Sequence, residues 1–225
     1  MILKFYRILF ALIVVTYLIA YFNIDKTKEI YSWLHFKGTV YKLEKKHSDL
    51  LSEIKLKTSL YILANKEKRK IFVYAKTKEE KKHSLVKTYD FTSFSGKAGP
   101  KLKRGDRQIP EGIYKPVFLN SRSSYHLSIG INYPNKFDKE KGALENRKDL
   151  GDKIFIHGSN VTIGCIPIGD DKIEELFVLI NHIGIENTVI VITPNDLITF
   201  PEIKDISWEN ELYQDLINDI SKNIK

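Results

Sequence analysis

Hydrophobic positions recur along this chain with two different periods, and the change of period divides it into stretches. An uncharged apolar run covers residues 8–22, and apolar side chains at three- and four-residue spacing in residues 25–58 predict an amphipathic helical stalk. From Ser59 onward, short alternating segments bounded by Gly, Pro and charge predict strands. We therefore expect a mainly β domain at 59–195 with a few helices, followed by a helical extension at 196–225.

Within the β domain, two segments that flank a charged turn predict a hairpin at 59–64 and 70–75. The clearest strand is predicted at 123–133, where apolar and polar positions alternate, with one face toward the core and the other toward solvent or a groove. A charged segment at 134–152 predicts a loop. Asp171 and Glu174 are spaced as a capping box at the start of a helix. Further strands are predicted at 85–91, 113–119, 154–156, 161–163 and 188–193.

The apolar run near the amino terminus predicts an uncleaved membrane anchor at residues 1–24. Lys4 and Arg7 precede the run and place that end in the cytoplasm, which puts the rest of the chain outside, in the periplasm. The run is short, since about 20 residues cross a bilayer. A cleaved signal peptide is the alternative, but the end of the run lacks the small residues of a cleavage site.

Charge and cysteine content narrow the classes of function. The chain has 225 residues and a net charge of +8, carried by lysines scattered through surface-like segments, which favours solubility over a binding patch for an anionic partner. No motif for nucleic-acid binding is present. The single cysteine excludes an intramolecular disulfide.

Candidate chemistry is concentrated in residues 154–167. His157 ends an apolar strand and is followed by Gly158, and Gly164 then precedes Cys165, the only cysteine. Cysteine catalysis needs a base within hydrogen-bond reach, and two neighbouring strand ends can supply that arrangement. The amides around Gly164 and Cys165 are candidates for an oxyanion hole. Spacing alone favours catalysis no more than a buried histidine and a buried cysteine in a hairpin.

The segment from Ser59 to Thr193 resembles the L,D-transpeptidase catalytic domain of YkuD type, and within it the YafK-like branch. The resemblance rests on these motifs: Arg104-Gly105-Asp106, Pro110-Glu111-Gly112, Ser124-Tyr125-His126-Leu127, Ile131-Asn132-Tyr133-Pro134-Asn135, Ile156-His157-Gly158 and Thr162-Ile163-Gly164-Cys165. It implies a β-sandwich or barrel-like domain that acts on peptidoglycan stem peptides, with a wall-linked protein as a second partner. It implies no metal and no cofactor.

By this resemblance Cys165 attacks the carbonyl of the L-centre of diaminopimelate and expels the terminal D-Ala. We expect Cys165 to be a reactive, partly exposed thiolate. An amine or water then resolves the thioester. His157 is the implied base, oriented by a carbonyl near Gly158 or by Ser159. The expected substrate-binding residues are Tyr133, Asn132, His126, Arg122 and Thr162.

Two departures from the commoner form of the family concern the substrate. Ile163 stands where that form has a histidine, and Pro167 stands where it often has Arg or Asn. Arg122 or Arg104 is a candidate to replace the lost cation. The branch is associated with cleaving a wall–protein linkage, so we expect hydrolysis or detachment over cross-linking. The rival interpretations are a sortase-like transpeptidase and a wall-binding scaffold of the same fold without turnover.

Overall fold

The computed structural model describes residues 2–196 and 206–224, and the chain divides into two compact units, Met1–Lys42 and Leu43–Lys225. Helix α1 (Ile2–Lys46) forms the first unit and runs on into the second. In the described part of the chain, no helix combines the length and apolarity needed to cross a membrane. The structure therefore does not support the anchor expected at residues 1–24, which stays a prediction. The domain boundaries predicted at 58/59 and 195/196 stay predictions.

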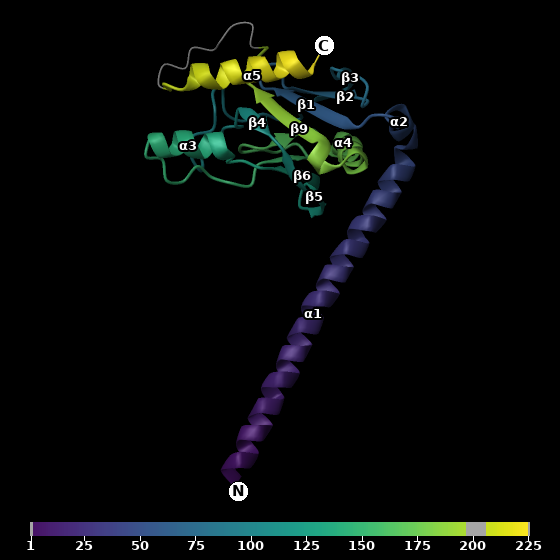
Figure 1. Cartoon of the computed structure of the whole chain (residues 1–225), viewed down its shortest axis with the longest axis vertical. Coiled ribbons are helices and arrows are strands. Elements are labelled where there is room, and N and C mark those ends of the chain that lie inside the picture. Colours follow the sequence, from purple (N-terminus) through teal and green to yellow (C-terminus); the bar gives the residue numbers. More distant parts are fainter. Residues whose placement is uncertain (1, 197–205, 225) are drawn as a thin grey trace. The chain divides into compact units, whose positions relative to one another are not determined.

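The second unit contains two sheets and the helices that cover them (Figure 1). A five-stranded sheet has the order β3-β2-β1-β9-β4, and a four-stranded sheet has the order β5-β6-β7-β8. The strands are β1 (Ser59–Asn65), β2 (Lys70–Lys76), β3 (Ser84–Asp90), β4 (Gly112–Tyr114), β5 (Pro116–Ser123), β6 (His126–Ile131), β7 (Phe155–His157), β8 (Ile166–Pro167) and β9 (Thr188–Thr193). The remaining helices are α2 (Ser48–Glu53), α3 (Lys136–Leu144), α4 (Asp170–Ile183), the 3-10 turn η1 (Ile185–Asn187) and α5 (Glu209–Asn223).

Helix α4 is the centre of the core. It contacts β1 of the larger sheet and β6 and β7 of the smaller one. Its apolar side chains at three- and four-residue spacing, Ile173, Leu176, Phe177 and Ile180, are all fully buried. Burial of such side chains from water supplies most of the free energy that holds the two sheets together.

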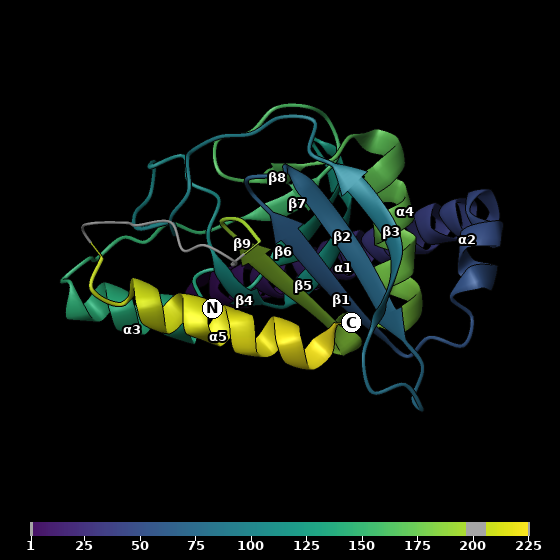
Figure 2. The same cartoon turned by 90° about the horizontal axis from the view of Figure 1, so that it is seen from above.

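Helix α5 packs on the larger sheet, as seen from above in Figure 2. Its N-cap residue Trp208 and its residues Leu212 and Tyr213 form one buried cluster with Tyr61 of β1 and Val191 of β9. The predicted C-terminal helix is thus confirmed, and it belongs to the core of the domain. The prediction of a mainly β sandwich or barrel is confirmed only in part, because the architecture is two sheets with an integral set of helices.

The strongest local patterns are confirmed. The predicted hairpin is β1–β2, paired antiparallel with Ser59 opposite Lys76. The last predicted strand is β9, which runs parallel to β1 with Ile190 beside Ile62. The segment predicted as one strand at 113–119 is two strands, β4 in the larger sheet and β5 in the smaller, so the chain changes sheets between them.

The strand predicted at 123–133 is wrong at its start. The chain turns at Ser124 and Tyr125, and β6 begins at His126, whose φ of 68° belongs to the turn. Residues Leu127–Ile131 are buried on both faces, so the predicted polar face does not meet solvent. The reason is tertiary, since β6 lies between β5 and β7 and α4 packs against it.

Three other local predictions are wrong. The predicted loop 134–152 contains α3, whose start is capped reciprocally by Asn135 and Asp138. The predicted strand 161–163 is an irregular loop. The predicted capping box of α4 is absent, because Gly169 is its N-cap and Glu174 contacts His126 and Lys46 instead.

Candidate active site

The chain brings His157 and Cys165 to one edge of the smaller sheet. His157 ends β7, and β8 begins directly after Cys165. These strands are parallel, with Ile156 beside Ile166 and His157 beside Pro167. Alternate residues of a strand share a face, so this register puts the side chains of His157 and Cys165 on the same face. The short loop 158–165 is the only segment of chain between His157 and β8, so no other helix or strand intervenes.

His157 is buried and held as a neutral base. Its Nδ1 lies 2.5 Å from the carbonyl oxygen of Gly158, which can only accept a hydrogen bond, so Nδ1 carries the proton and Nε2 is left as the acceptor. Burial lowers the pKa of His157, and the Gly158 carbonyl opposes this shift in part. The ring of Tyr125 lies over the imidazole, with centroids 4.6 Å apart. The expected orientation of His157 by a backbone carbonyl near Gly158 is present.

Cys165 is partly exposed, as expected, but it is not a resting thiolate. Burial raises the pKa of the Cys165 thiol, and the backbone of Phe155 and the charge of Lys101 offset that rise only in part. The thiol is therefore protonated at neutral pH, and Sγ donates to the carbonyl of Lys153 at 3.8 Å. No hydrogen bond joins Sγ to His157 in the described structure. Transfer of the thiol proton to His157 would therefore require a rotation of the thiol.

The loop before Cys165 is ordered by Thr162. Its Oγ1 donates to the carbonyl oxygen of Cys165 at 2.7 Å and accepts from the amide of Gly164 at 3.1 Å. The Gly164 amide is thus occupied, which contradicts its expected place in an oxyanion hole in this state. Gly164 has a φ of 133°, and a Cβ there would approach the carbonyl oxygen of Gln108 to 3.1 Å. This φ angle and this close approach favour glycine at position 164, beside Cys165.

Gly158 and Ser159 contribute backbone rather than side-chain chemistry. A Cβ on Gly158 would lie 2.6 Å from the carbonyl oxygen of Tyr125 and 2.5 Å from Oδ1 of Asp170. The amide of Ser159 donates to the same Asp170 oxygen at 2.7 Å, and its carbonyl accepts from Thr92. These contacts fix the turn after His157 against the start of α4.

A cavity of about 450 Å³ lies beside Cys165. It is lined by Lys101, Arg104, Gly105, Arg107, Gly151, Asp152, Lys153, Ile154, Ile163, Gly164 and Cys165. Ile163 is 78% exposed, so an apolar side chain stands at the cavity where the commoner family form has histidine. In the described residues, no three side chains of His, Cys, Asp or Glu are grouped to hold a metal ion.

Residues 59–192, more than half of the chain, match the family model described as YkuD, the L,D-transpeptidase catalytic domain. The chain belongs to the YkuD family. The resemblance stated from the motifs is therefore confirmed. The Escherichia coli K12 protein named "Putative L,D-transpeptidase YafK" is 34% identical over 120 residues, 52% of this chain and 46% of that protein. The chain thus spans about half the length of the curated relatives it matches.

A solved structure supports the fold of this YkuD domain. The crystal structure of the helical cell shape determining protein Pgp2 from Campylobacter jejuni superposes with a TM-score of 0.50. Its sequence identity is 20%, and the match covers 66% of this chain and 55% of that chain. At that identity, the likeness concerns the fold alone.

None of the five expected substrate-binding residues lines the cavity beside Cys165 in this YkuD domain. Tyr133 is buried and donates to the carbonyl of Leu150 at 2.9 Å. Asn132 accepts from the amide of Lys115 at 2.8 Å and holds the bend between β4 and β5. Arg122 lies on β5 near its exposed end. Thr162 orders the loop before Cys165 through its hydrogen bonds to Gly164 and Cys165.

His126, the remaining member of this group, points to α4. Its Nε2 lies 2.8 Å from Oε1 of Glu174, whose other oxygen accepts from Lys46 and lies 3.4 Å from His47. Burial works to raise the pKa of Glu174, but hydrogen bonds from Lys46 and the two histidines lower it overall. This cluster connects the end of α1 to α4, and through His126 it also contacts the β5–β6 turn that carries Tyr125.

Most of the polar lining of the cavity was not predicted from the sequence. Arg104 was singled out, but Lys101, Arg107 and Lys153 were not. These residues come from two loops far apart in the chain, so no local spacing links them to Cys165. The available signal was the charged, glycine-containing composition of residues 101–107 and 149–153, which is typical of loops at functional sites.

Proposed function

We propose that this YkuD domain is a cysteine acyl-transfer enzyme acting on peptidoglycan stem peptides. The observation that carries the proposal is the neutral His157, with Nδ1 bonded to the Gly158 carbonyl, on the same sheet face as the only cysteine. A base and a thiol placed in this way beside a cavity are the minimum for nucleophilic catalysis. Membership of the L,D-transpeptidase family supports the substrate class.

The reaction proceeds in two balanced steps. Nε2 of His157 takes the Sγ proton while sulfur bonds to the carbonyl carbon at the L-centre of diaminopimelate. The carbon–nitrogen bond then breaks, and His157 returns the proton to the departing D-Ala amine, which leaves a thioester on Cys165. In the second step an amine or water attacks the thioester, His157 takes its proton, and sulfur leaves as the thiol. No external oxidant or reductant is required.

The second step decides between cross-linking and release, and we propose release. Ile163 is exposed at the cavity, and buried Pro167 stands where the commoner form often carries Arg or Asn. An acceptor stem peptide therefore lacks two polar groups that would hold it near the thioester, so water competes better. Incubation with tetrapeptide muropeptides, and separately with muropeptides that carry a lysine-linked peptide, tests this. Abundant diaminopimelate–diaminopimelate dimers without tripeptide or released lysine peptide would contradict it.

The first step is tested by trapping the nucleophile. The full-length chain is treated with a carbapenem, whose strained amide acylates nucleophilic thiols, and analysed by intact mass spectrometry. Because the chain has one cysteine, an adduct that Cys165→Ser lacks locates the site without peptide mapping. An unmodified wild type that still binds peptidoglycan would favour the scaffold without turnover.

The location follows from the proposed substrate. Peptidoglycan lies outside the cytoplasmic membrane, so we expect the catalytic domain there as well. Fractionation of cells that produce the full-length chain, with a protease accessibility assay, measures this directly. Protection of the domain in intact spheroplasts would exclude it.

A further inference from the structure

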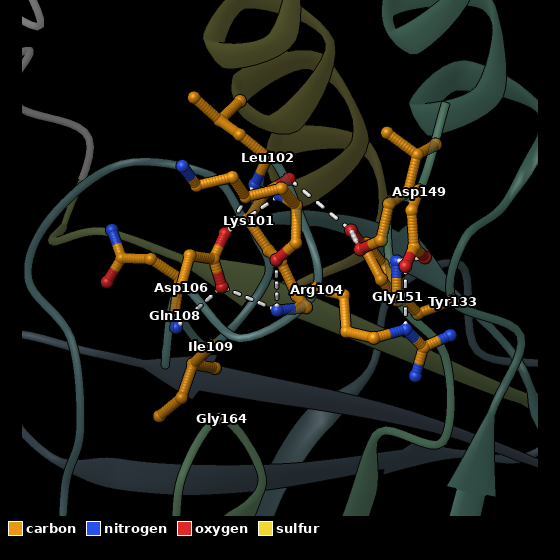
Figure 3. A network of polar contacts seen from close by, with 12 residues as sticks. Lys101, Leu102, Arg104, Asp106, Gln108, Ile109, Tyr133, Asp149, Gly151 and Gly164 are labelled. Carbon is orange, nitrogen blue, oxygen red and sulfur yellow. Dashed lines mark hydrogen bonds and ion pairs between the residues drawn. The ribbon is translucent and has the colours of Figure 1, made fainter. Parts of the chain in front are cut away.

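The cavity beside Cys165 is strongly cationic. Four basic side chains line it, and Asp152 is the only acidic one among the described lining residues. Asp152 is itself engaged, because Arg104 donates to it at 3.0 Å and to Asp149 at 2.8 Å. Lys101 is likewise committed, since its ammonium pairs with Asp106 and donates to the carbonyl of Lys103. Figure 3 shows the Lys101–Asp106 pair within one loop and Arg104 reaching Asp149 of the other.

The other two cations, Arg107 and Lys153, differ from Lys101 and Arg104 in having no partner of their own among the described residues. In the described part of the chain, neither side chain makes a hydrogen bond or an ion pair, and both are exposed at the cavity. Their positive charges are therefore available to a ligand. A guanidinium and an ammonium at one cavity suit a carboxylate. The carboxylate accepts two hydrogen bonds from the guanidinium and is attracted by the positive charge of the ammonium.

Both residues are also held in an unusual backbone conformation. The φ angles are 58° for Arg107 and 57° for Lys153, a region that residues with a Cβ seldom adopt. Such conformations persist where the surroundings hold them, and they are concentrated at functional sites. Here Asp106 accepts from the amide of Gln108 and fixes the turn that carries Arg107 (Figure 3).

Each of the two loops also contacts the nucleophile segment through its backbone. The carbonyl of Lys153 accepts from Sγ of Cys165 at 3.8 Å. The backbone carbons and oxygen at 107–108 lie against Gly164, close enough that a Cβ there would meet them. A ligand held by the two side chains thus shares one cavity with the sulfur, and the backbone of both loops contacts the segment that carries Cys165.

We propose that Arg107 and Lys153 form the carboxylate subsite that positions the stem peptide for attack by Cys165. This inference rests on the proposed function and assigns the specificity of the same site. It replaces the suggestion that Arg104 or Arg122 holds the substrate, since Arg104 is already paired with two carboxylates and Arg122 is not at the cavity. The carboxylate comes from the terminal D-Ala or from the D-centre of diaminopimelate.

The test uses the full-length chain and three synthetic tetrapeptides: the free acid, the C-terminal amide, and the peptide amidated at the D-centre of diaminopimelate. We expect Arg107→Gln and Lys153→Gln each to lower kcat/KM for the free acid by roughly 10- to 100-fold, mainly through KM. Arg107→Lys should recover part of the loss, because charge returns without the bidentate geometry. The matched control is Lys103→Gln, which removes one exposed charge from the same loop away from the cavity.

The amidated peptides identify the source of the carboxylate. With the peptide that lacks the recognised carboxylate, wild type should be as slow as Arg107→Gln, so the effect of the variant disappears. An equal loss on all three peptides would mean that Arg107 is structural and would overturn the inference. A loss for Lys103→Gln as large as for Arg107→Gln would reduce it to general charge attraction and overturn it too. A wild type that cleaves none of the peptides and forms no adduct would defeat the proposed function itself.

Discussion

At the scale of single residues, burial shifts the pKa values of the two groups proposed to react, His157 and Cys165, in opposite directions. It lowers the pKa of His157 and raises the pKa of Cys165, because a low-dielectric surrounding disfavours the charged form of each. The resting pair is therefore a neutral imidazole and a protonated thiol. Near neutral pH the imidazole of His157 is free to accept a proton, and the thiol of Cys165 must lose one to become a nucleophile.

The first prediction follows from the pKa of His157. In the proposed mechanism the base is the neutral imidazole, so kcat/KM should rise with pH through a pKa below the usual 6.5 and level off by neutrality. His157→Gln should lose this acid limb together with about 10²–10⁴ of the rate. The measurement is kcat/KM for the tetrapeptide between pH 4.5 and 8. An acid limb above pH 7, or one that persists in the variant, would assign the base elsewhere.

A second residue prediction concerns stability. Burial raises the pKa of Asp138 to about 6, above its usual value, although hydrogen bonds from Asn135 and Tyr114 oppose this. As pH falls through 6, the carboxyl of Asp138 becomes protonated in the native state, whereas in the unfolded chain it stays ionised down to about pH 4. The native state is therefore stabilised relative to the unfolded chain as pH falls through that window. The gain is about 2–3 kcal/mol when complete.

The measurement compares the free energy of unfolding of wild type and Asp138→Asn from pH 7 to pH 4. The asparagine keeps an acceptor for the amide of Asn135 but cannot titrate. We expect wild type to gain stability relative to the variant as pH falls. A constant difference across the range would show that Asp138 titrates normally.

At the scale of elements, the site is made by two connections of the smaller sheet. The β5–β6 turn carries Tyr125 onto the His157 ring, and the β7–β8 loop carries Cys165. Neither connection is a regular element, so its shape depends on a few polar contacts. In the β7–β8 loop those contacts are made by Thr162, which bonds to both Gly164 and Cys165.

The third prediction tests that loop. Thr162→Val has a similar shape but loses the hydroxyl, so the loop is released and the sulfur is less well placed. We expect acylation by a carbapenem to slow by about 10- to 100-fold, since a displacement near 1 Å costs up to that much. Thr162→Ser keeps the hydroxyl and serves as the control, with a rate near wild type. Equal rates for the two variants would remove Thr162 from the positioning of Cys165.

At the scale of the whole molecule, a buried ion pair joins the C-terminal helix to the core and to the cavity loop. Lys66, at the end of β1, pairs with Glu111 at 2.8 Å, and both side chains are almost wholly inaccessible. The other oxygen of Glu111 accepts from Tyr213 of α5 at 3.0 Å. Lys66 also donates to the carbonyls of Gly99 and Ile109, which bracket the loop that carries Arg107.

The fourth prediction follows from that burial. Glu111→Gln leaves the buried Lys66 without its counter-charge, and burial already lowers the pKa of Lys66. We expect the free energy of unfolding to fall by about 3 kcal/mol, the usual cost of breaking a buried pair. The control is Lys68→Gln, which breaks an exposed pair with Asp196 and should cost under about 1 kcal/mol. Denaturant titration of both variants decides, and equal losses would contradict the distinction.

The sequence by itself determined the elements whose patterns are local. The β1–β2 hairpin, β9, the apolar stripe of α4 and the spacing of α5 were all predictable, because alternation and helical spacing are properties of adjacent residues. The motifs around His157 and Cys165 were also sufficient to identify the family. A short loop keeps those two residues together whatever the rest of the chain does.

Only the tertiary structure decided the details that depend on distant segments. The turn at Ser124 and Tyr125 follows from the position of β6 between two strands, and Tyr133 is a core residue because Leu150 offers it a carbonyl. The left-handed conformations of Arg107 and Lys153 have no local signature, since both residue types are ordinary in any loop. Their position beside Cys165 arises from two loops joined by ion pairs across the fold. Contacts of that kind are set by three-dimensional packing, which spacing along the chain does not encode.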